Sequence, residues 1–213
     1  MSAQVASRVV RLNGLMRLAA GGSAAVLLVA VLGFAFLVRP WYLRWGATDA
    51  EVQMPLPGDS LIPEGAVVST RAATIHAPAA VVWRWLVQVG QGRAGFYSYD
   101  WLENLFAADM HNSGHLRPEL QRLQVGDHVS LQRNGPFAVV MAIQPGQALV
   151  LDGGWTFLLS PVDADTTRLI VRYAFDVSTL GAKLYYYSIF EPAHFVMESG
   201  MMLGLKQRAE AQG

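Results

Sequence analysis

Hydrophobic positions recur at regular spacing from about residue 67 to about residue 209, and their period changes along the chain. Val67–Ile75 is rich in β-branched residues and is predicted as a strand. His76-Ala77-Pro78 then breaks the pattern, and proline is well placed to open a helix. An apolar stripe with helical spacing indicates that helix, and it consists of Val81, Val82, Trp85, Leu86 and Val89.

Beyond this helix the pattern predicts a second short helix, five strands and a final helix. The short helix covers Tyr99–Phe106, and the final one starts near Pro192 and runs to about Ala209. Turn-forming residues separate the strands, which are predicted over His128–Gln132, Ala138–Gln144, Ala148–Leu151, Trp155–Val162 and Thr166–Asp176. This order is an α+β pattern, and an antiparallel sheet can curl around one long helix and leave a cavity between them.

A second hydrophobic pattern precedes this domain, where 21 consecutive uncharged residues run from Leu18 to Val38. As a helix this run would be about 31 Å long, which matches the hydrocarbon core of a bilayer. The rival interpretations are a buried core helix and a cleaved signal peptide, which has a shorter apolar region and a small-residue cleavage site. Here bulky residues end the run, and Trp41, Tyr42 and Trp45 suit a membrane interface. We therefore expect a retained, single-pass transmembrane helix.

Composition divides the chain into three parts: a tail and membrane helix in residues 1–46, a linker or strap with three prolines in residues 47–66, and a folded domain in residues 67–213. Residues 1–46 hold five arginines and no acidic residue, for a formal charge of +5. The remainder holds sixteen acidic and eleven basic residues, for a charge of −5. Three arginines precede the apolar run and two follow it, which favours a domain on the non-cytoplasmic side. An acidic domain without a basic cluster is a poor nucleic-acid binder, so we expect no nucleic-acid partner.

Four segments carry a resemblance to a known superfamily: residues 70–105 (TRAATIHAPAAVVWRWLVQVGQGRAGFYSYDWLENL), 110–112 (MHN), 118–131 (PELQRLQVGDHVSL) and 191–210 (EPAHFVMESGMMLGLKQRAE). Together with the element order they resemble the START-like or helix-grip superfamily, also called SRPBCC, and within it a polyketide cyclase/dehydrase-like bacterial subgroup. The resemblance implies a helix-grip fold with a cavity for a hydrophobic ligand, because the superfamily binds lipids, sterols and polyketides and only a minority of its members are catalysts. One departure is the strand count, since five strands follow the helices where the superfamily usually has six. A further strand is therefore expected within Arg117–Gly126 or within residues 128–144.

Polar and ionisable side chains are densest between Arg93 and His115. Eight of them are candidate ligand-binding residues at the mouth of the cavity: Arg93, Tyr97, Tyr99, Asp100, Glu103, Asn104, His111 and Asn112. On a helix an acid, an amide and a phenol from this set are neighbours at i, i+4 and can converge on the polar end of a ligand. The structural alternative is that Asp100 caps the helix, Glu103 is solvated, and Trp101, Leu102 and Leu105 belong to the core.

The final helix contributes two more candidates, His194 and Glu198, which are neighbours at i, i+4. In a helix-grip fold their face of the helix borders the cavity. Gly200 and Gly204 form a smooth strip on this helix, which predicts a close approach of the sheet or of a ligand.

Signals for catalysis and metal binding are weak. The chain has no cysteine and no G-x-S-x-G elbow, and the spacing of Asp100 and Glu103 is ordinary for solvated carboxylates. His111 and His115 have the spacing of a zinc pair, but the turn formers between them oppose the helix that such a pair needs. We therefore expect no cofactor and no metal, and we find no convincing catalytic constellation.

Three functions remain open. The leading one is a membrane-anchored START-like module that binds or shuttles a lipophilic small molecule. The second is a cofactor-independent enzyme acting on a polyketide-like or lipid substrate in the same cavity, and the third is a scaffold protein with a vestigial cavity. The sequence leaves the ligand's identity, the protein partners and the oligomeric state open.

Overall fold

The computed structural model describes Ser23, Val26, Val29 and residues 31–105 and 107–212. The chain falls into two compact units, with the boundary between Tyr42 and Leu43. In the first unit the described residues from 31 to 42 are helical and include the π-helical turn η1 (Phe34–Val38). Ten of the 21 residues of the apolar run Leu18–Val38 lie outside the described residues. Among those that are described, no helix is both long enough and apolar enough to cross a membrane.

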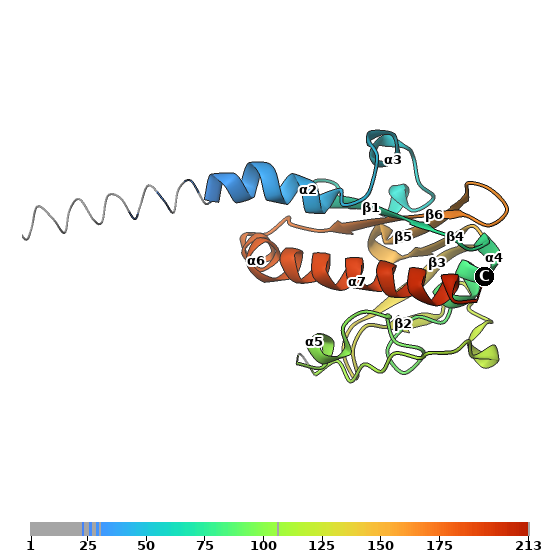
Figure 1. Cartoon of the computed structure of the whole chain (residues 1–213). Helices are drawn as coiled ribbons and strands as arrows, with labels where there is room; N and C mark the ends of the chain where they lie inside the picture. The colour runs from blue at the N-terminus through green and yellow to red at the C-terminus, as the bar shows by residue number, and fades with distance from the viewer. Residues whose placement is uncertain (1–22, 24–25, 27–28, 30, 106, 213) are drawn as a thin grey trace, which may run out of the picture. The chain divides into compact units, whose positions relative to one another are not determined.

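In the second unit six antiparallel strands form one sheet in the order β1-β6-β5-β4-β3-β2 (Figure 1). Each lies where the alternation of the sequence predicts it, with ends within two residues: β1 (Val67–Ile75), β2 (His128–Ser130), β3 (Phe137–Gln144), β4 (Ala148–Leu151), β5 (Thr156–Pro161) and β6 (Thr167–Phe175). The expected further strand is wrong. Arg117–Gly126, which is fully described, forms only the 3₁₀ turn η3 (Pro118–Leu120), where proline removes a backbone donor, and residues 128–144 hold β2 and β3 alone.

Three predicted helices are present: α4 (Ala79–Leu86), α5 (Asp100–Leu105) and α7 (Glu191–Glu210). Two helical segments that were not predicted, α6 (Leu180–Tyr185) and the π-helical η5 (Tyr186–Phe190), extend α7 toward its N-terminus. The Thr179 side chain caps α6 by accepting a hydrogen bond from the Ala182 amide at 3.1 Å. Large apolar residues in this stretch are exposed on several sides, so no one-sided stripe announces the helix.

The segment between residues 47 and 62 is a strap on the sheet and contains α3 (Asp49–Gln53) and the 3₁₀ turn η2 (Asp59–Leu61). Thr48 and Glu51 form a capping box at the start of α3. Two arginines of β6 hold the strap: Arg168 donates to Glu51 at 2.6 Å, and Arg172 donates to both Asp59 oxygens at 2.8 Å. The Arg168 hydrogen bond is the main reason that the pKa of Glu51 falls to about 2.

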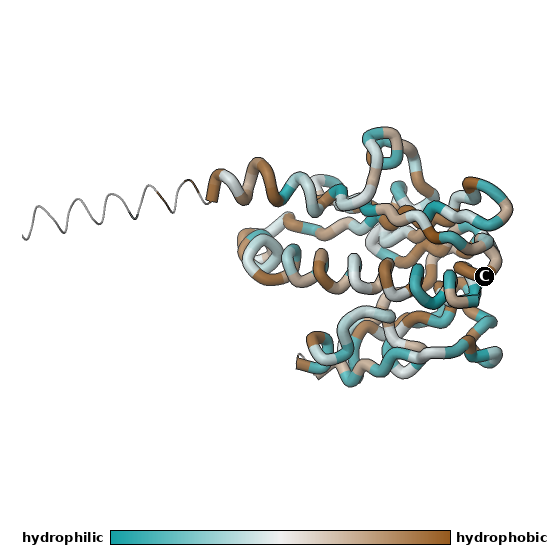
Figure 2. Tube along the Cα trace, in the orientation of Figure 1, coloured by the Kyte–Doolittle hydropathy of each residue, from teal (hydrophilic) through white to brown (hydrophobic). Residues whose placement is uncertain are grey.

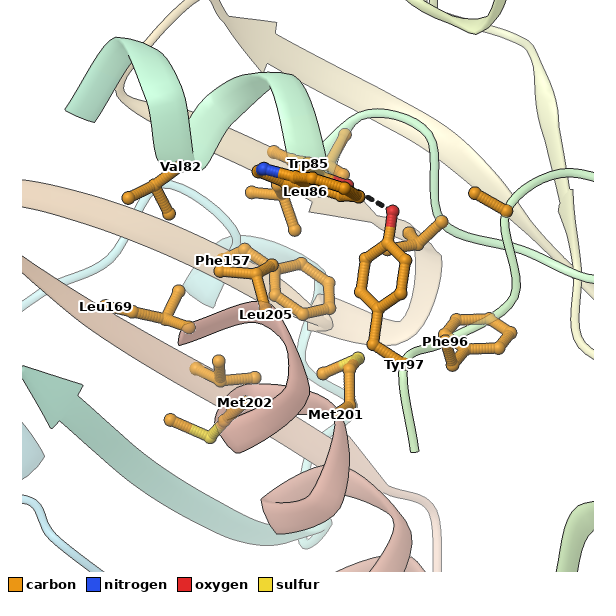
Figure 3. Packing of buried hydrophobic residues seen from close by; sticks show 14 of the residues in the cluster. Val82, Trp85, Leu86, Phe96, Tyr97, Phe157, Leu169, Met201, Met202 and Leu205 are labelled. Atoms are coloured by element: carbon orange, nitrogen blue, oxygen red, sulfur yellow. Dashed lines mark hydrogen bonds between the residues drawn. The ribbon is translucent and has the colours of Figure 1, made fainter. Parts of the chain in front are cut away.

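Strand β1 shows how the sheet separates two environments. Ala73 and Ile75 belong to the main core, which includes residues of α4 and α7, whereas Ala72 joins a small cluster with Leu56 of the strap. Figure 3 shows Met201, Met202 and Leu205 of α7 close to Phe157 and Leu169 of the sheet. Hydrophobic positions concentrate along the central strands in Figure 2, with hydrophilic positions at the outer loops.

Candidate ligand-binding cavity

A cavity of about 490 Å³ lies in the second unit beside helix α7. Its volume falls in the range typical of small-molecule sites. Most of its wall is aromatic or aliphatic, and the ionisable groups in it are few. The lining residues are Phe96, Glu103, Ala108, Met110, Leu131, Gln132, Pro136, Trp155, Tyr173, Tyr185, Ile189, Phe190, Ala193, His194, Met197, Glu198 and Met201.

A buried ion pair supports one side of this wall. Arg71 of β1 donates to Glu198 of α7, and each side chain is only 1% exposed. The guanidinium also lies over the ring of Phe195, 5.4 Å from its centroid. This pairing compensates two charges that would otherwise be very costly to bury.

His194 lies between the ion pair and the aromatic wall. Its Nδ1 is 3.4 Å from Arg71 Nη1, and its Nε2 is 3.6 Å from Glu198 Oε1. Burial, opposed in part by the charge of Glu198, lowers the pKa of His194 to about 4, so the ring is neutral at physiological pH. Since arginine can only donate, Nδ1 is assigned as the acceptor, and Nε2, on the side of Glu198 Oε1, carries the proton.

Glu103 of α5 is a second carboxyl in the wall, with 1% of the residue exposed. Burial raises its pKa to about 7, and the nearby charge of Asp100 adds to the effect. A carboxyl with this pKa can exist in either protonation state near neutral pH, and can therefore donate or accept a proton or hydrogen bond.

Aromatic rings cluster around Trp155 in the part of the wall next to His194. The Trp155 ring meets Tyr173 edge-on, with centroids 5.6 Å apart, and stacks with Phe96 at 6.2 Å. Tyr173 in turn lies 4.1 Å from the ring of His194. Burial raises the pKa of Tyr173 above its usual range, so its hydroxyl stays protonated.

Three buried polar atoms of the lining residues have no hydrogen-bond partner in the described part of the chain: Glu103 Oε2, Trp155 Nε1 and Glu198 Oε1. An unpaired buried donor or acceptor is costly, on the order of 1–3 kcal/mol. Their concentration around one cavity suits a molecule that brings its own polar groups.

The ten candidate residues of the sequence separate into two groups. Glu103, His194 and Glu198 line the cavity, whereas the seven others are not among its lining residues. The structural alternative is wrong about three of its residues, because Glu103 is buried while Trp101 and Leu105 are more than two-thirds exposed.

Four of the seven instead hydrogen-bond to the backbone of α4 and of the loops before and after α5. The Asn104 side chain exchanges two hydrogen bonds with the backbone of Met110, and Asn112 accepts from the Tyr97 amide at 2.6 Å. The Tyr97 hydroxyl donates to the Trp85 carbonyl at 3.0 Å (Figure 3), and burial raises its pKa to about 12. Arg93 donates to three backbone carbonyls, two of them in the turn after α4, Val87 and Val89.

Of the remaining three, Tyr99 and His111 are exposed and Asp100 is half-buried. Tyr99 is exposed and lies against Gly200, where an added Cβ would collide with the tyrosine ring. Asp100 begins α5 and accepts a hydrogen bond from the Asn112 amide at 3.3 Å. His111 is exposed on a loop that is not helical, so it does not form a helical pair with His115. Among the described residues no three His, Asp, Glu or Cys side chains cluster as a metal site would require.

Arg71, Trp155 and Tyr173 were missed by the sequence analysis. Arg71 did leave a signal, because it shares the core-facing side of β1 with Ala73 and Ile75, where a lone charge requires a buried partner. Trp155 and Tyr173 carry no comparable signal, since aromatic residues in and beside strands are common in any core.

No family model matches the sequence, and no curated protein matches it either. Solved structures with a similar chain path include the conserved protein of unknown function EF2215 from Enterococcus faecalis, at 11% identity, 82% of each chain covered and a TM-score of 0.40. The self-sacrificing resistance protein CalC from Micromonospora echinospora has 11% identity, with 68% of this chain and 96% of CalC covered and a TM-score of 0.43. The Zhui aromatase/cyclase from Streptomyces sp. R1128 has 14% identity, with 69% and 95% covered and a TM-score of 0.36. Similarities at this level do not assign the chain to a family.

Proposed function

We propose that this protein is a membrane-anchored module that binds a lipophilic small molecule in the cavity beside α7. The observation that supports it best is the cavity itself, about 490 Å³ in volume and lined mainly by aromatic and aliphatic side chains. A vestigial site in a scaffold protein would be filled by its own side chains, and this volume argues against that alternative.

The unpaired atoms of the wall indicate what the ligand presents. A hydroxyl group can donate to Glu198 Oε1 and accept from Trp155 Nε1. It can therefore pair with an unpaired acceptor and with an unpaired donor of the wall. A ligand carboxylate would meet the negative charge of Glu198, and a ligand cation would compete with Arg71, which already pairs with it. The preferred ligand is therefore a neutral, hydrophobic molecule that carries a hydroxyl group.

The anchor is supported by the sequence of the run Leu18–Val38. Of the described side chains in that run, Val26, Val29, Phe36 and Leu37 are each more than two-thirds exposed. Exposed aliphatic and aromatic side chains of this size are favourable in lipid and costly in water.

Ligand binding is tested with residues 43–213, which form a compact unit with a hydrophobic core of their own. We expect an apolar fluorescent dye such as N-phenyl-1-naphthylamine to bind with micromolar affinity, roughly −8 kcal/mol. We expect 1-naphthol to displace it about tenfold better than naphthalene, since one added hydrogen bond contributes about 1 kcal/mol or more. Trp155→Phe should remove most of that difference, whereas Trp101→Phe, at an exposed position, should preserve it. Absence of dye binding would contradict the proposed function.

A second candidate function is catalysis without a cofactor, and the state of Glu103 favours it. A cavity-lining carboxyl with a pKa of about 7 meets the requirement for a general acid or base near neutral pH. If the protein is an enzyme, Glu103→Gln should stop chemical change of the natural ligand while preserving its affinity. A ligand recovered chemically unchanged from the native protein after prolonged incubation would argue for binding alone.

A further inference from the structure

The helical segment Leu180–Ile189, which we name the apolar tip, exposes an unusual amount of hydrophobic surface. Five of its large side chains are exposed: Leu180 by 73%, Leu184 by 61%, Tyr185 by 51%, Tyr187 by 46% and Ile189 by 56%. Its only charged residue is Lys183. In Figure 1 the segment lies at the end of the long helix that is away from the C-terminus, and Figure 2 shows several strongly hydrophobic positions at that end. Clustered exposure of this kind marks an interaction surface.

The apolar tip also borders the entrance of the cavity. Tyr185 and Ile189 both line the cavity, and both are about half exposed, so they lie where it meets the surface. Glu103 of α5 also lines the cavity, and Trp101 and Leu105 of the same helix are more than two-thirds exposed. Hydrophobic side chains therefore occur on two elements that border the same cavity.

The chain enters the second unit close to this end of the helix. Trp45 meets Phe195 of α7 with ring centroids 6.5 Å apart and a near-perpendicular angle of 72°. Phe195 follows Ile189 by six residues and Leu184 by eleven, or about 9 and 17 Å along a helix. Val38, the last residue of the apolar run, precedes Leu43 by five residues, which span at most about 18 Å.

From these observations we propose that the apolar tip inserts into the surface of the lipid bilayer and delivers the cavity entrance to it. The inference rests on the proposed membrane anchor, because a domain tethered this closely cannot leave the bilayer surface. The composition of the tip suits lipid: tyrosine favours the headgroup level, leucine and isoleucine favour the acyl region, and a lone lysine can extend its charge into water. A lipophilic ligand then passes between bilayer and cavity without crossing water.

The absence of cysteine from the chain makes a direct test available. The full-length variants Leu184→Cys and Val162→Cys each take one environment-sensitive nitrobenzoxadiazole label. Val162 is the matched control, because it is an apolar residue 64% exposed at the turn after β5. Each labelled chain is reconstituted in vesicles of phosphatidylcholine and phosphatidylglycerol.

We expect doxyl groups on the lipid chains to quench the label at position 184 strongly and aqueous iodide to quench it little, with the reverse at position 162. Equal iodide quenching at both positions would overturn the inference. Protection from iodide without doxyl quenching would also overturn it, since a second copy of the chain would then cover the tip. If an alkaline wash removes the chain from the vesicles, the anchor is refuted, and this inference with it. Dye binding by residues 43–213 would still support the ligand-binding part of the proposed function.

A second measurement follows transfer rather than depth. The double variant Leu180→Glu/Leu184→Glu changes exposed residues that are not in the cavity wall, so folding and dye affinity in solution should be retained. We expect its uptake of N-phenyl-1-naphthylamine from vesicles to be about tenfold slower than that of the native chain. An unchanged uptake rate at unchanged affinity would contradict lipid docking by the tip.

Discussion

Replacement of Glu103 by glutamine should make the protein more stable at alkaline pH. The folded-state pKa of Glu103 is about 7, against 4.5 for the free side chain, and burial is the main cause. Each pKa unit corresponds to about 1.4 kcal/mol, so ionising this carboxyl in the folded protein costs roughly 3 kcal/mol. Because the pKa is raised in the folded state, Glu103 does not lower the free energy of unfolding below about pH 4.5, where the carboxyl is protonated in both states. The loss of stability grows as pH rises from about 4.5 and is complete above about pH 7.

His194 changes stability in the opposite direction over an overlapping range. Its pKa is lowered from 6.5 to about 4, so its contribution is present above pH 6.5 and is lost as pH falls toward 4. Between about pH 4.5 and 6.5 the two effects nearly cancel in the native protein. Glu103→Gln removes the effect of Glu103 and leaves that of His194. The stability of the variant should therefore rise with pH across this interval.

The assay is thermal unfolding of native and variant chains from pH 4.5 to 8.5. At pH 8 we expect the variant to be about 3 kcal/mol more stable, which raises the melting temperature by roughly 6–12 °C in a unit of this size. Near pH 5 the two should differ by less than about 1 kcal/mol. Glu64→Gln, at an exposed position, is the matched control and should leave the pH dependence unchanged. Parallel pH profiles for native protein and Glu103→Gln would refute the reasoning.

Four further outcomes are expected. Gly204→Ala should destabilise the fold by about 2 kcal/mol or more in thermal melts, because the new Cβ would collide with the Tyr97 carbonyl. Its control, Gly181→Ala in α6, has free space around the new Cβ and should stabilise the fold by about 0.5–1 kcal/mol. Arg71→Met should cost about 3–5 kcal/mol by leaving Glu198 buried and unpaired, and Arg71→Met/Glu198→Met should recover most of that loss; an equally unstable double variant would contradict the pairing. Asp100→Ala should lower the pKa of Glu103, detectable as a shift of its pH–stability profile to lower pH, and an unmoved profile would exclude the interaction. Arg168→Met should loosen the strap and return the pKa of Glu51 toward its ordinary value, measured by carboxyl NMR titration; an unchanged titration would mean that other groups hold it.

The sequence was sufficient for the sheet, because its strands lie between distinct turn signals, and for the long C-terminal helix, because Pro192 stands where that helix begins. Strands β1 and β4 have the predicted ends, since each alternates or runs apolar between distinct turn signals. Helix α6 could not be predicted, because its apolar residues face solvent rather than one core-facing stripe. Its N-cap Thr179 is recognisable only once a helix is known to follow.

The site was less predictable, for a physical reason. Local density of polar residues favoured Arg93–His115, but most of those side chains hydrogen-bond to the backbone of their own loop, as Asn104 and Asn112 do. The cavity wall instead combines residues from distant strands and helices. Arg71 and Glu198 meet across 127 positions of sequence, and only the packing of α7 against β1 brings them together.

Native mass spectrometry of the full-length chain, released from membranes in a mild detergent, tests the central claim most directly. Ala193→Trp places a large side chain in the cavity wall, and Ala50→Trp places the same side chain at an exposed position of α3. The account predicts that the native chain and Ala50→Trp retain a hydrophobic small molecule that is released on unfolding, and that Ala193→Trp does not. Retention of the same molecule by Ala193→Trp at the native level would contradict a ligand-binding role for this cavity.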